Sequence, residues 1–270
     1  MSEAFYLPRG EGRYLPTEHT AGPWSPDSQH FGPPSALLVR ELESIPAARE
    51  MLLGRVTVEI LGPAPLTELT VRAGLERPGR SVELLSAELA AGGRVVAKAS
   101  GWRFATSDTT EVAEGSAAPL APVEDCPPAD WPATWNDGYL KAMEWRKISG
   151  RVTDPGPAAV WARQRVPLVD GEKPSPLQRL FTVADSGNGT SNRLDMREWL
   201  FINAELTVHV HREPVGEWIG LDADTVLGPQ GLGTATSRLH DTTGQVGTGA
   251  QALLVRARPD GRPAAGQSRS

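Results

Sequence analysis

"RSVELLSAELAAGGRVVAKASGWRF", residues 80–104, contains two apolar stretches separated by the pair Gly92-Gly93. Adjacent glycines readily adopt the positive φ angles that a tight hairpin turn requires. We therefore predict two antiparallel strands that are joined at this turn.

Two further strands precede the hairpin. In residues 52–62, LLGRVTVEILG, the side chains of Val56, Val58 and Ile60 fall on one face of a strand. Residues 66–77, LTELTVRAGLER, follow a bend that two prolines mark. Together with the two strands of the hairpin, these give about four antiparallel strands.

A helix is predicted ahead of these strands, in residues 32–45, GPPSALLVRELESI. Pro34 suits a first helical turn, and Leu38 and Leu42 are four positions apart. The first half of the chain therefore consists of one helix followed by a sheet.

The second half has the same order of elements. Residues 175–187, SPLQRLFTVADSG, predict a helix with Ser175 at its cap and Pro176 in its first turn. Strands are predicted in residues 158–168, 199–213, 216–228, 231–244 and 245–258, with Thr242-Thr243-Gly244 as a hairpin turn.

The two halves repeat at an offset of about 150 residues. The alternating set Val56-Val58-Ile60 matches Leu206-Val208-Val210, and the two glycine hairpins match at nearly the same offset. A repeat of this length indicates two similar domains, because a solenoid has a period of about 20–50 residues. We assign residues 1–106 and 151–258 to the domains, residues 107–150 to a linker rich in Pro, Ala and acids, and residues 259–270 to a disordered tail.

Composition narrows the functional classes. The 270-residue chain is 39% hydrophobic and 22% charged, which is typical of a globular protein. Its net charge of −6 argues against nucleic-acid binding, and its single cysteine, Cys126, favours a reducing compartment. With no leader sequence and no long apolar run, we expect a soluble cytoplasmic protein that does not insert into membranes.

Common catalytic motifs are missing from the sequence. It has no G-x-S-x-G nucleophile elbow and no glycine-rich nucleotide-binding motif, which argues against serine hydrolases and dinucleotide enzymes. His209 and His211 alternate on a predicted strand, but without a third ligand at fitting spacing they indicate a solvated strand face, and we expect no metal.

Asp185 stands out in "FTVADSGNG", residues 181–189, because it interrupts an apolar stretch just before Gly187-Asn188-Gly189. It is either a solvated acid at the end of a helix or a catalytic carboxylate at the mouth of a cleft. The residues alone leave both interpretations open.

The duplicated helix and sheet are represented by HFGPPSALLVRELE (30–43), RVTVEILGPAPL (55–66), GRSVELLSAELAAGGRVVAKA (79–99), VADSGNG (183–189), FINAELTVHVHREPVGEWIGL (201–221) and QVGTGAQALLV (245–255). In their order, spacing and duplication these motifs resemble the TesB-like acyl-CoA thioesterase family, which has the double hotdog fold. This α+β fold contains two helix-wrapped antiparallel sheets in one chain. Hotdog hydratases use an Asp five residues before a His, and none of the five histidines here has one.

The resemblance implies which residues are catalytic. The family orients a water with an Asp, a Thr or Ser, and a Gln, and these positions match Asp185, Asn203 and Gln251. Asn203 departs from the family hydroxyl, although its amide both donates and accepts hydrogen bonds. Without the resemblance, Asn203 and Gln251 would be ordinary polar groups of strands.

Substrate contacts are expected around the two helix ends. Backbone N–H groups at Gly187, Asn188 and Gly189, or at the start of the first helix near His30 and Gly32, are candidate oxyanion donors. A structural role for His30 between loop and helix is an equal alternative. Candidate contacts for the phosphates of CoA are Arg193, Arg197 and Arg212.

The leading hypothesis is an acyl-CoA thioesterase of lipid metabolism that uses no cofactor and self-associates into a homo-oligomer, as the family does. One alternative is a non-catalytic acyl-CoA or acyl-chain binding protein, favoured by the loss of the hydroxyl at Asn203. Another is a purely structural assembly module. Turnover of acyl-CoA would favour the thioesterase, binding without turnover would favour the binding protein, and the absence of both would favour the assembly module.

Overall fold

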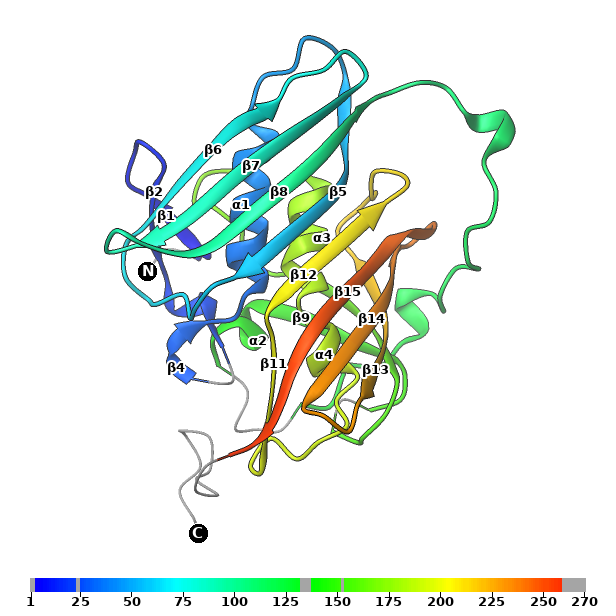
Figure 1. The fold of residues 1–270 in the computed structure, drawn as a ribbon. Helices are drawn as coiled ribbons and strands as arrows, with labels where there is room; N and C mark the ends of the chain where they lie inside the picture. Colours follow the sequence, from blue (N-terminus) through cyan, green and yellow to red (C-terminus); the bar gives the residue numbers. More distant parts are fainter. Residues whose placement is uncertain (1–2, 23–24, 132–136, 152, 259–270) are drawn as a thin grey trace.

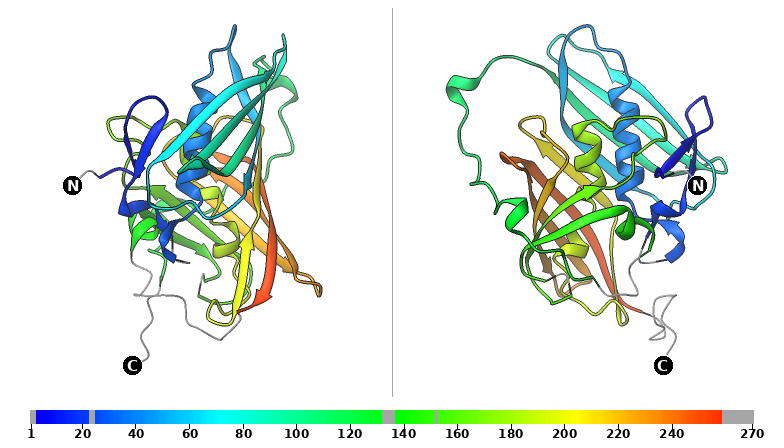
Figure 2. Two further views of the ribbon diagram at one scale, coloured as in Figure 1. Left: turned by 60° about the vertical axis from the view of Figure 1, so that its left-hand side comes forward. Right: turned by 180° about the vertical axis from the view of Figure 1, so that it is seen from behind.

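The computed structural model describes residues 3–22, 25–131, 137–151 and 153–258 (Figure 1). Within these residues a 13-stranded sheet runs through both halves of the chain, and neighbouring strands are antiparallel. The two long helices lie side by side against one face of this sheet, as the views in Figures 1 and 2 show. This arrangement confirms the α+β double hotdog fold.

The strands of the large sheet are, in spatial order, β1 (Tyr6–Pro8), β2 (Arg13–Pro16), β6 (Leu69–Arg77), β7 (Val82–Ala91), β8 (Arg94–Ala105), β5 (Met51–Ile60), β12 (Glu205–Val210), β15 (Gly244–Ala257), β14 (Leu232–Asp241), β13 (Ile219–Leu227), β10 (Ala158–Gln164) and β9 (Met143–Ser149). Off this path, β11 (Trp199–Asn203) pairs with β15. A small separate sheet contains β3 (Ala21–Gly22) and β4 (Ser25–Gln29). The helices are α1 (Gly32–Glu43), α2 (Gly138–Ala142), α3 (Pro176–Ala184) and α4 (Gly187–Thr190), with 3-10 turns at Glu18–Thr20, Thr110–Val112 and Val123–Asp125.

The two long helices form where the sequence predicts them. In α1 the fixed φ of a proline fits the first turn, and Leu37, Leu38 and Leu42 are fully buried. In α3 the hydroxyl of Ser175 accepts a hydrogen bond from the Gln178 N–H at 3.1 Å and so caps the helix. Because each helix contacts both the sheet and the other helix, each is buried over most of its surface.

The two halves are joined by the pairing of β5 with β12. Thr57 lies directly opposite Thr207, 150 residues away, and their hydroxyl oxygens are 3.0 Å apart. The irregularities of the sheet repeat at the same offset, since the register shifts between Leu89 and Ala90 and again between Leu239 and His240. The halves are therefore related by an approximate twofold axis through this Thr57–Thr207 contact.

The predicted hairpin turns are present. Gly92 and Gly93 have φ angles of 55° and 81°, as a two-residue turn between β7 and β8 requires, and β14 turns into β15 at residues 242 and 243. The strand predicted at 199–213 is divided into β11 and β12 at Ala204.

The segment predicted as a linker, residues 107–150, includes two ordered elements that composition did not indicate. Residues 138–142 form α2, and residues 143–149 form β9, which pairs with β10 at the edge of the sheet. The buried side chains of Met143 and Trp145 alternate along β9, but a Pro-rich stretch in front of them obscures this short pattern. The part before them arches away from the sheet, as Figure 1 shows. The predicted disordered tail, 259–270, lies outside the described residues.

An ion pair stabilises the turn between β14 and β15. Arg212 donates to both carboxylate oxygens of Asp241, whose side chain is fully buried. Although burial raises the pKa of Asp241, hydrogen bonds from Arg212, Thr243 and the Val215 N–H hold that pKa below its ordinary value. The other two arginines considered for phosphate are also paired, Arg193 with Asp224 and Arg197 with Asp195. Among the described residues, no helix is long and apolar enough to cross a membrane.

We predict that Arg212→Ala destabilises the protein by about 2–3 kcal/mol, because the buried Asp241 loses its cation. The value is below that of a fully buried pair, since about a third of the Arg212 side chain is exposed. Urea unfolding followed by circular dichroism measures the change. Arg197→Ala breaks an exposed pair and serves as the control, with no measurable loss of stability expected. Equal effects of the two substitutions would contradict this assignment.

Candidate functional site

The end of α3 positions Asp185 inside the protein. The apolar residues of this helix pack against the sheet, and Asp185 follows them as the C-cap residue. The chain then turns directly into the short helix α4, so the carboxylate lies between two helices. Only 4% of Asp185 is exposed, which excludes the solvated acid that the sequence left open.

Three donors converge on this carboxylate. The Asn203 side-chain amide donates to Asp185 Oδ1 at 2.9 Å, Gln251 Nε2 lies 3.5 Å from the same oxygen, and the Phe31 backbone N–H also bonds the carboxylate. Burial raises the pKa of Asp185 to about 6, although these three hydrogen bonds act in the opposite direction. At neutral pH the group is therefore a carboxylate that accepts a proton more readily than an exposed Asp.

His30 lies beside Asp185 as a neutral ring. Its Nδ1 is 3.4 Å from Asp185 Oδ2, a distance within the range of an ion pair. However, burial lowers the pKa of His30 to about 3, and Nδ1 accepts a hydrogen bond from the Gly32 N–H at 3.0 Å. The proton of the neutral ring is consequently on Nε2, and the contact is not a charged pair at neutral pH.

Tyr139 of α2 holds this ring in place. The two rings are stacked, with centroids 3.9 Å apart and planes inclined by 7°. The Tyr139 hydroxyl in turn contacts the Ser186 hydroxyl at 2.9 Å and the Thr182 carbonyl oxygen at 2.8 Å. Tyr139, which lies in the segment predicted as a linker, thus connects the ring of His30 to the end of α3 through stacking and hydrogen bonds.

Gln251 lies behind the carboxylate. Its Nε2 donates to the Asp185 carbonyl oxygen at 3.0 Å, and its Oε1 accepts from the Asn188 N–H at 2.9 Å. The side chain is 2% exposed and is not among the residues that line the adjoining cleft. These hydrogen bonds connect α4 and the end of α3 to β15.

A cleft of about 490 Å³ opens in front of Asp185, within the size range of small-molecule sites. His30 and Phe31 line it from the start of α1, Asn188 from α4, and Asn203 from the end of β11. Apolar walls are provided by Ile60, Leu61, Ile202 and Leu254. Residues distant in sequence thus meet around one carboxylate.

The three glycines predicted to contact the substrate, Gly32, Gly187 and Gly189, differ in how closely they are packed. A Cβ at Gly187 would lie 2.8 Å from Gln251 Oε1 and 2.9 Å from the Ser237 hydroxyl, so this glycine permits close packing inside the protein. Gly32 is packed against the Thr182 carbonyl, whereas nothing lies within 4 Å of a Cβ at Gly189. None of the three lines the cleft.

Most of the backbone donors considered for an oxyanion are already used. The N–H of Phe31 bonds Asp185, that of Gly32 bonds His30, and that of Asn188 bonds Gln251. Among the described residues, the Nε2–H of His30 and the second amide hydrogen of Asn203 have no hydrogen-bond acceptor, and both residues line the cleft.

Sequence reasoning missed Tyr139. It proposed the backbone N–H groups at the start of the first helix as oxyanion donors, whereas the Phe31 N–H bonds the Asp185 carboxylate. Tyr139 follows a Pro-rich stretch and acts through stacking with a residue more than 100 positions earlier. Neither role leaves a local signal in the sequence.

Comparisons with known proteins agree with this architecture. Family models of the acyl-CoA thioesterase N-terminal and C-terminal domains match residues 20–104 and 123–255. The second match begins within the segment that we expected to be a linker and includes β9. A search of curated proteins found no match.

Solved structures share the fold at low sequence identity. A hot dog protein of unknown function from Alicyclobacillus acidocaldarius has a TM-score of 0.75 at 16% identity, covering 95% of this chain and 97% of its own. A tesB protein from Mycobacterium avium subsp. paratuberculosis has a TM-score of 0.67 at 16% identity, with coverages of 93% and 95%. An acyl-CoA thioesterase II from Mycobacterium marinum has a TM-score of 0.65 at 13% identity, with coverages of 96% and 97%. Because the two family models together match most of the chain, it belongs to the acyl-CoA thioesterase family.

Proposed function

We propose that the protein hydrolyses acyl-CoA thioesters to a carboxylic acid and free CoA, with Asp185 as the general base. The observation that carries this proposal is a buried carboxylate that borders a cleft of about 490 Å³, with amide and imidazole groups beside it. Membership of the family supports the substrate class.

The reaction needs a positioned water, a proton acceptor and donors for the developing oxyanion. The Asp185 carboxylate and the Asn203 amide oxygen hold the water. As it attacks the thioester carbon, Asp185 takes its proton, and the carbonyl oxygen becomes an oxyanion. When the C–S bond breaks, this proton passes to the departing thiolate, so that water and thioester give acid and thiol.

The two uncommitted donors of the site stabilise the oxyanion in this scheme. They are the Nε2–H of His30 and the second amide hydrogen of Asn203. Asn203 thus takes the place of the family hydroxyl as a hydrogen-bonding group, and a water mechanism does not require it to be a nucleophile. Gln251 contributes by holding Asp185 and Asn188, and Gly187 allows that close contact.

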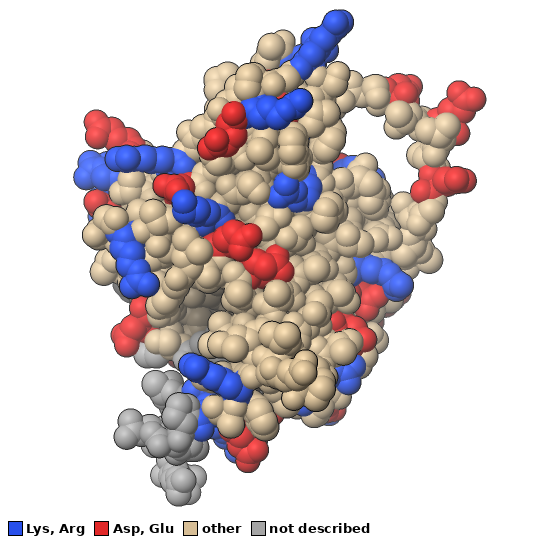
Figure 3. All heavy atoms as spheres, in the orientation of Figure 1, with Lys and Arg blue, Asp and Glu red and all other residues tan. Residues whose placement is uncertain are grey.

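Acyl-CoA binding, cytoplasmic location and a role in lipid metabolism are parts of this proposal, as is self-association through the sheet. An apolar row crosses three strands, because Ile202 and Leu232 are each paired with Leu254. All three side chains are at least 43% exposed, and Figure 3 shows few charged groups over this part of the sheet. Such a row suits contact with a second copy of the chain.

We expect hydrolysis of at least part of a panel of acyl-CoAs from two to sixteen carbons, and a loss of about 100-fold or more in kcat for Asp185→Asn, the scale of general base catalysis. Mass spectrometry of released CoA measures turnover. Tight binding without turnover by the unmodified protein would instead favour the acyl-CoA binding alternative. Neither binding nor turnover by the folded protein would favour the assembly module.

The rate should depend on the ionisation of Asp185. Because the base must be unprotonated, kcat/KM is expected to fall as the pH decreases through about 6 and to reach a plateau above pH 7. His30 stays neutral over this range, since burial lowers its pKa to about 3. Initial rates between pH 5 and 8 with a short-chain acyl-CoA measure the profile. A flat profile would exclude Asp185 as the base.

Ionised Asp185 should also lower the stability of the fold. A carboxyl group whose pKa rises from 3.8 to about 6 on folding favours the folded state below pH 3.8, and this contribution is lost as the pH rises through 6. Asp185→Asn is therefore expected to stabilise the protein by up to about 3 kcal/mol at pH 8, with a smaller gain at pH 5.

Chemical unfolding at both pH values measures this difference. Asp195→Asn is the control, because hydrogen bonds with Arg197 lower the pKa of this exposed acid, so that no gain is expected. A loss of stability for Asp185→Asn at pH 8 would show that the carboxylate is structural.

A further inference from the structure

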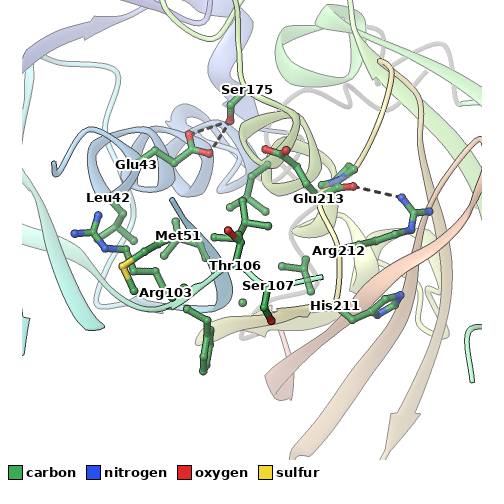
Figure 4. Close-up of a pocket in the computed structure, with 18 residues that line it drawn as sticks. Leu42, Glu43, Met51, Arg103, Thr106, Ser107, Ser175, His211, Arg212 and Glu213 are labelled. Carbon is green, nitrogen blue, oxygen red and sulfur yellow. Dashed lines mark hydrogen bonds between the residues drawn. The ribbon is translucent and has the colours of Figure 1, made fainter. Parts of the chain in front are cut away.

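A second cavity, of about 570 Å³, lies at the opposite end of α1 and α3 (Figure 4). It is formed by the last turn of α1, the start of α3, the beginning of β5 and the ends of β8 and β12. Asp185 and the other residues of the candidate catalytic site do not line it. It is a separate space of similar size within the same molecule.

This second cavity is the twofold counterpart of the catalytic cleft. An offset of 150 residues, in one direction or the other, relates many of the strand residues that line it to residues that line the cleft, as the Thr57–Thr207 axis requires. The corresponding lining pairs include Leu52 and Ile202, Leu53 and Asn203, Phe104 and Leu254, and Val210 and Ile60.

The polar catalytic positions are apolar in this counterpart. Leu53 stands at the position of Asn203 and Gly101 at that of Gln251. A Cβ at Gly101 would lie 2.8 Å from Leu53 and 3.2 Å from Leu42, so an apolar side chain from the last turn of α1 lies beside Gly101, whereas Asp185 lies beside Gln251 in the other half. The second cavity therefore retains the space of a ligand site without groups that could activate a water.

The charges at this cavity leave an excess of carboxylate. Of its two arginines, Arg212 is paired with the buried Asp241 and Arg103 with the buried Glu83. Glu43 and Glu213 also line it, and neither has an ion-pair partner among the described residues. In Figure 4 both carboxylates lie on the same side of the cavity.

Glu43 is held by neutral donors. The Ser175 hydroxyl lies 2.9 Å from its carboxylate, and Gln178 Nε2 donates to it at 2.7 Å. Burial raises the pKa of Glu43, the hydrogen bonds from Gln178 and Ser175 oppose this effect, and the smaller contributions of the Glu213 and Arg40 charges act in opposite directions. A cation at this position would relieve the repulsion between the two acids, whereas an anionic head group would be repelled by both.

We propose that the second cavity binds an amphiphile with an apolar chain and a cationic head group. The chain occupies the space lined by Leu42, Leu53 and Phe104, and the head group lies between Glu43 and Glu213. An apolar cavity with a few convergent polar groups is the usual form of a small-molecule site. This proposal does not depend on the hydrolysis of acyl-CoA.

Isothermal titration calorimetry of the full chain with decylammonium, below the concentration at which it forms micelles, tests the proposal. We expect saturable binding of decylammonium and at least about tenfold weaker binding of decanoate, which has the same chain and the opposite charge. Glu43→Gln and Glu213→Gln should each weaken decylammonium binding about tenfold, the effect of losing one charge-assisted contact.

Substitutions at two positions related by the twofold axis, one in each cavity, identify the cavity that binds decylammonium. Leu52→Trp and Ile202→Trp change exposed side chains, 40% and 43% accessible, at equivalent positions of the two spaces. Leu52→Trp is expected to weaken binding about tenfold or more, and Ile202→Trp to leave it unchanged. Absence of binding, equal binding of decanoate, insensitivity to both Gln variants, or sensitivity to Ile202→Trp alone would overturn the proposal.

Discussion

The pairing of β5 with β12 is the contact on which the rest of the structure depends. It makes one sheet of two repeated halves and sets Thr57 against Thr207 on the approximate twofold axis. With the sheet continuous, α1 and α3 must pack against each other in antiparallel fashion, so that the start of one helix meets the end of the other. A cavity forms at each of these two meeting points, and the symmetry of the backbone gives both a comparable volume.

Side chains break this symmetry. At one end, Asp185, Asn203 and Gln251 form a connected polar group, while at the other Leu53 and Gly101 fill the positions of Asn203 and Gln251 and Leu42 packs beside them. Burying a carboxylate costs free energy unless hydrogen bonds replace its hydration, and here donors from both halves provide them. Such a network requires several residues at once, which explains why a scaffold with two equivalent cavities can have its polar site in only one of them.

The sequence allowed much of the fold to be predicted, because alternation and paired glycines are local signals. The two long helices, the hairpins and the repeat at 150 residues were recognisable from residues such as Leu38, Val56 and Gly92, whereas α2 and α4 were not predicted. β9 was missed, since its alternation is short and follows a Pro-rich stretch. Asp185 stood out as an acid that interrupts an apolar stretch, and the family resemblance indicated its catalytic role together with Asn203 and Gln251. The engaged N–H of Phe31 and the stacking of Tyr139 on His30 arise only from the folded arrangement.

The hydrogen bonds of Gln251 indicate whether this residue contacts the substrate or supports the residues that do. A glutamine amide that already donates to the Asp185 carbonyl and accepts from Asn188 has little capacity left for a water. The groups proposed to act on substrate, Asp185, Asn203 and His30, all line the cleft, and His30 comes from the first half of the repeat whereas Asp185 and Asn203 come from the second. His30 precedes α1, whereas Asp185 follows α3, so neither half could form this site alone. The duplication is thus a requirement of the site, because one half supplies the carboxylate and the other supplies the start of the facing helix.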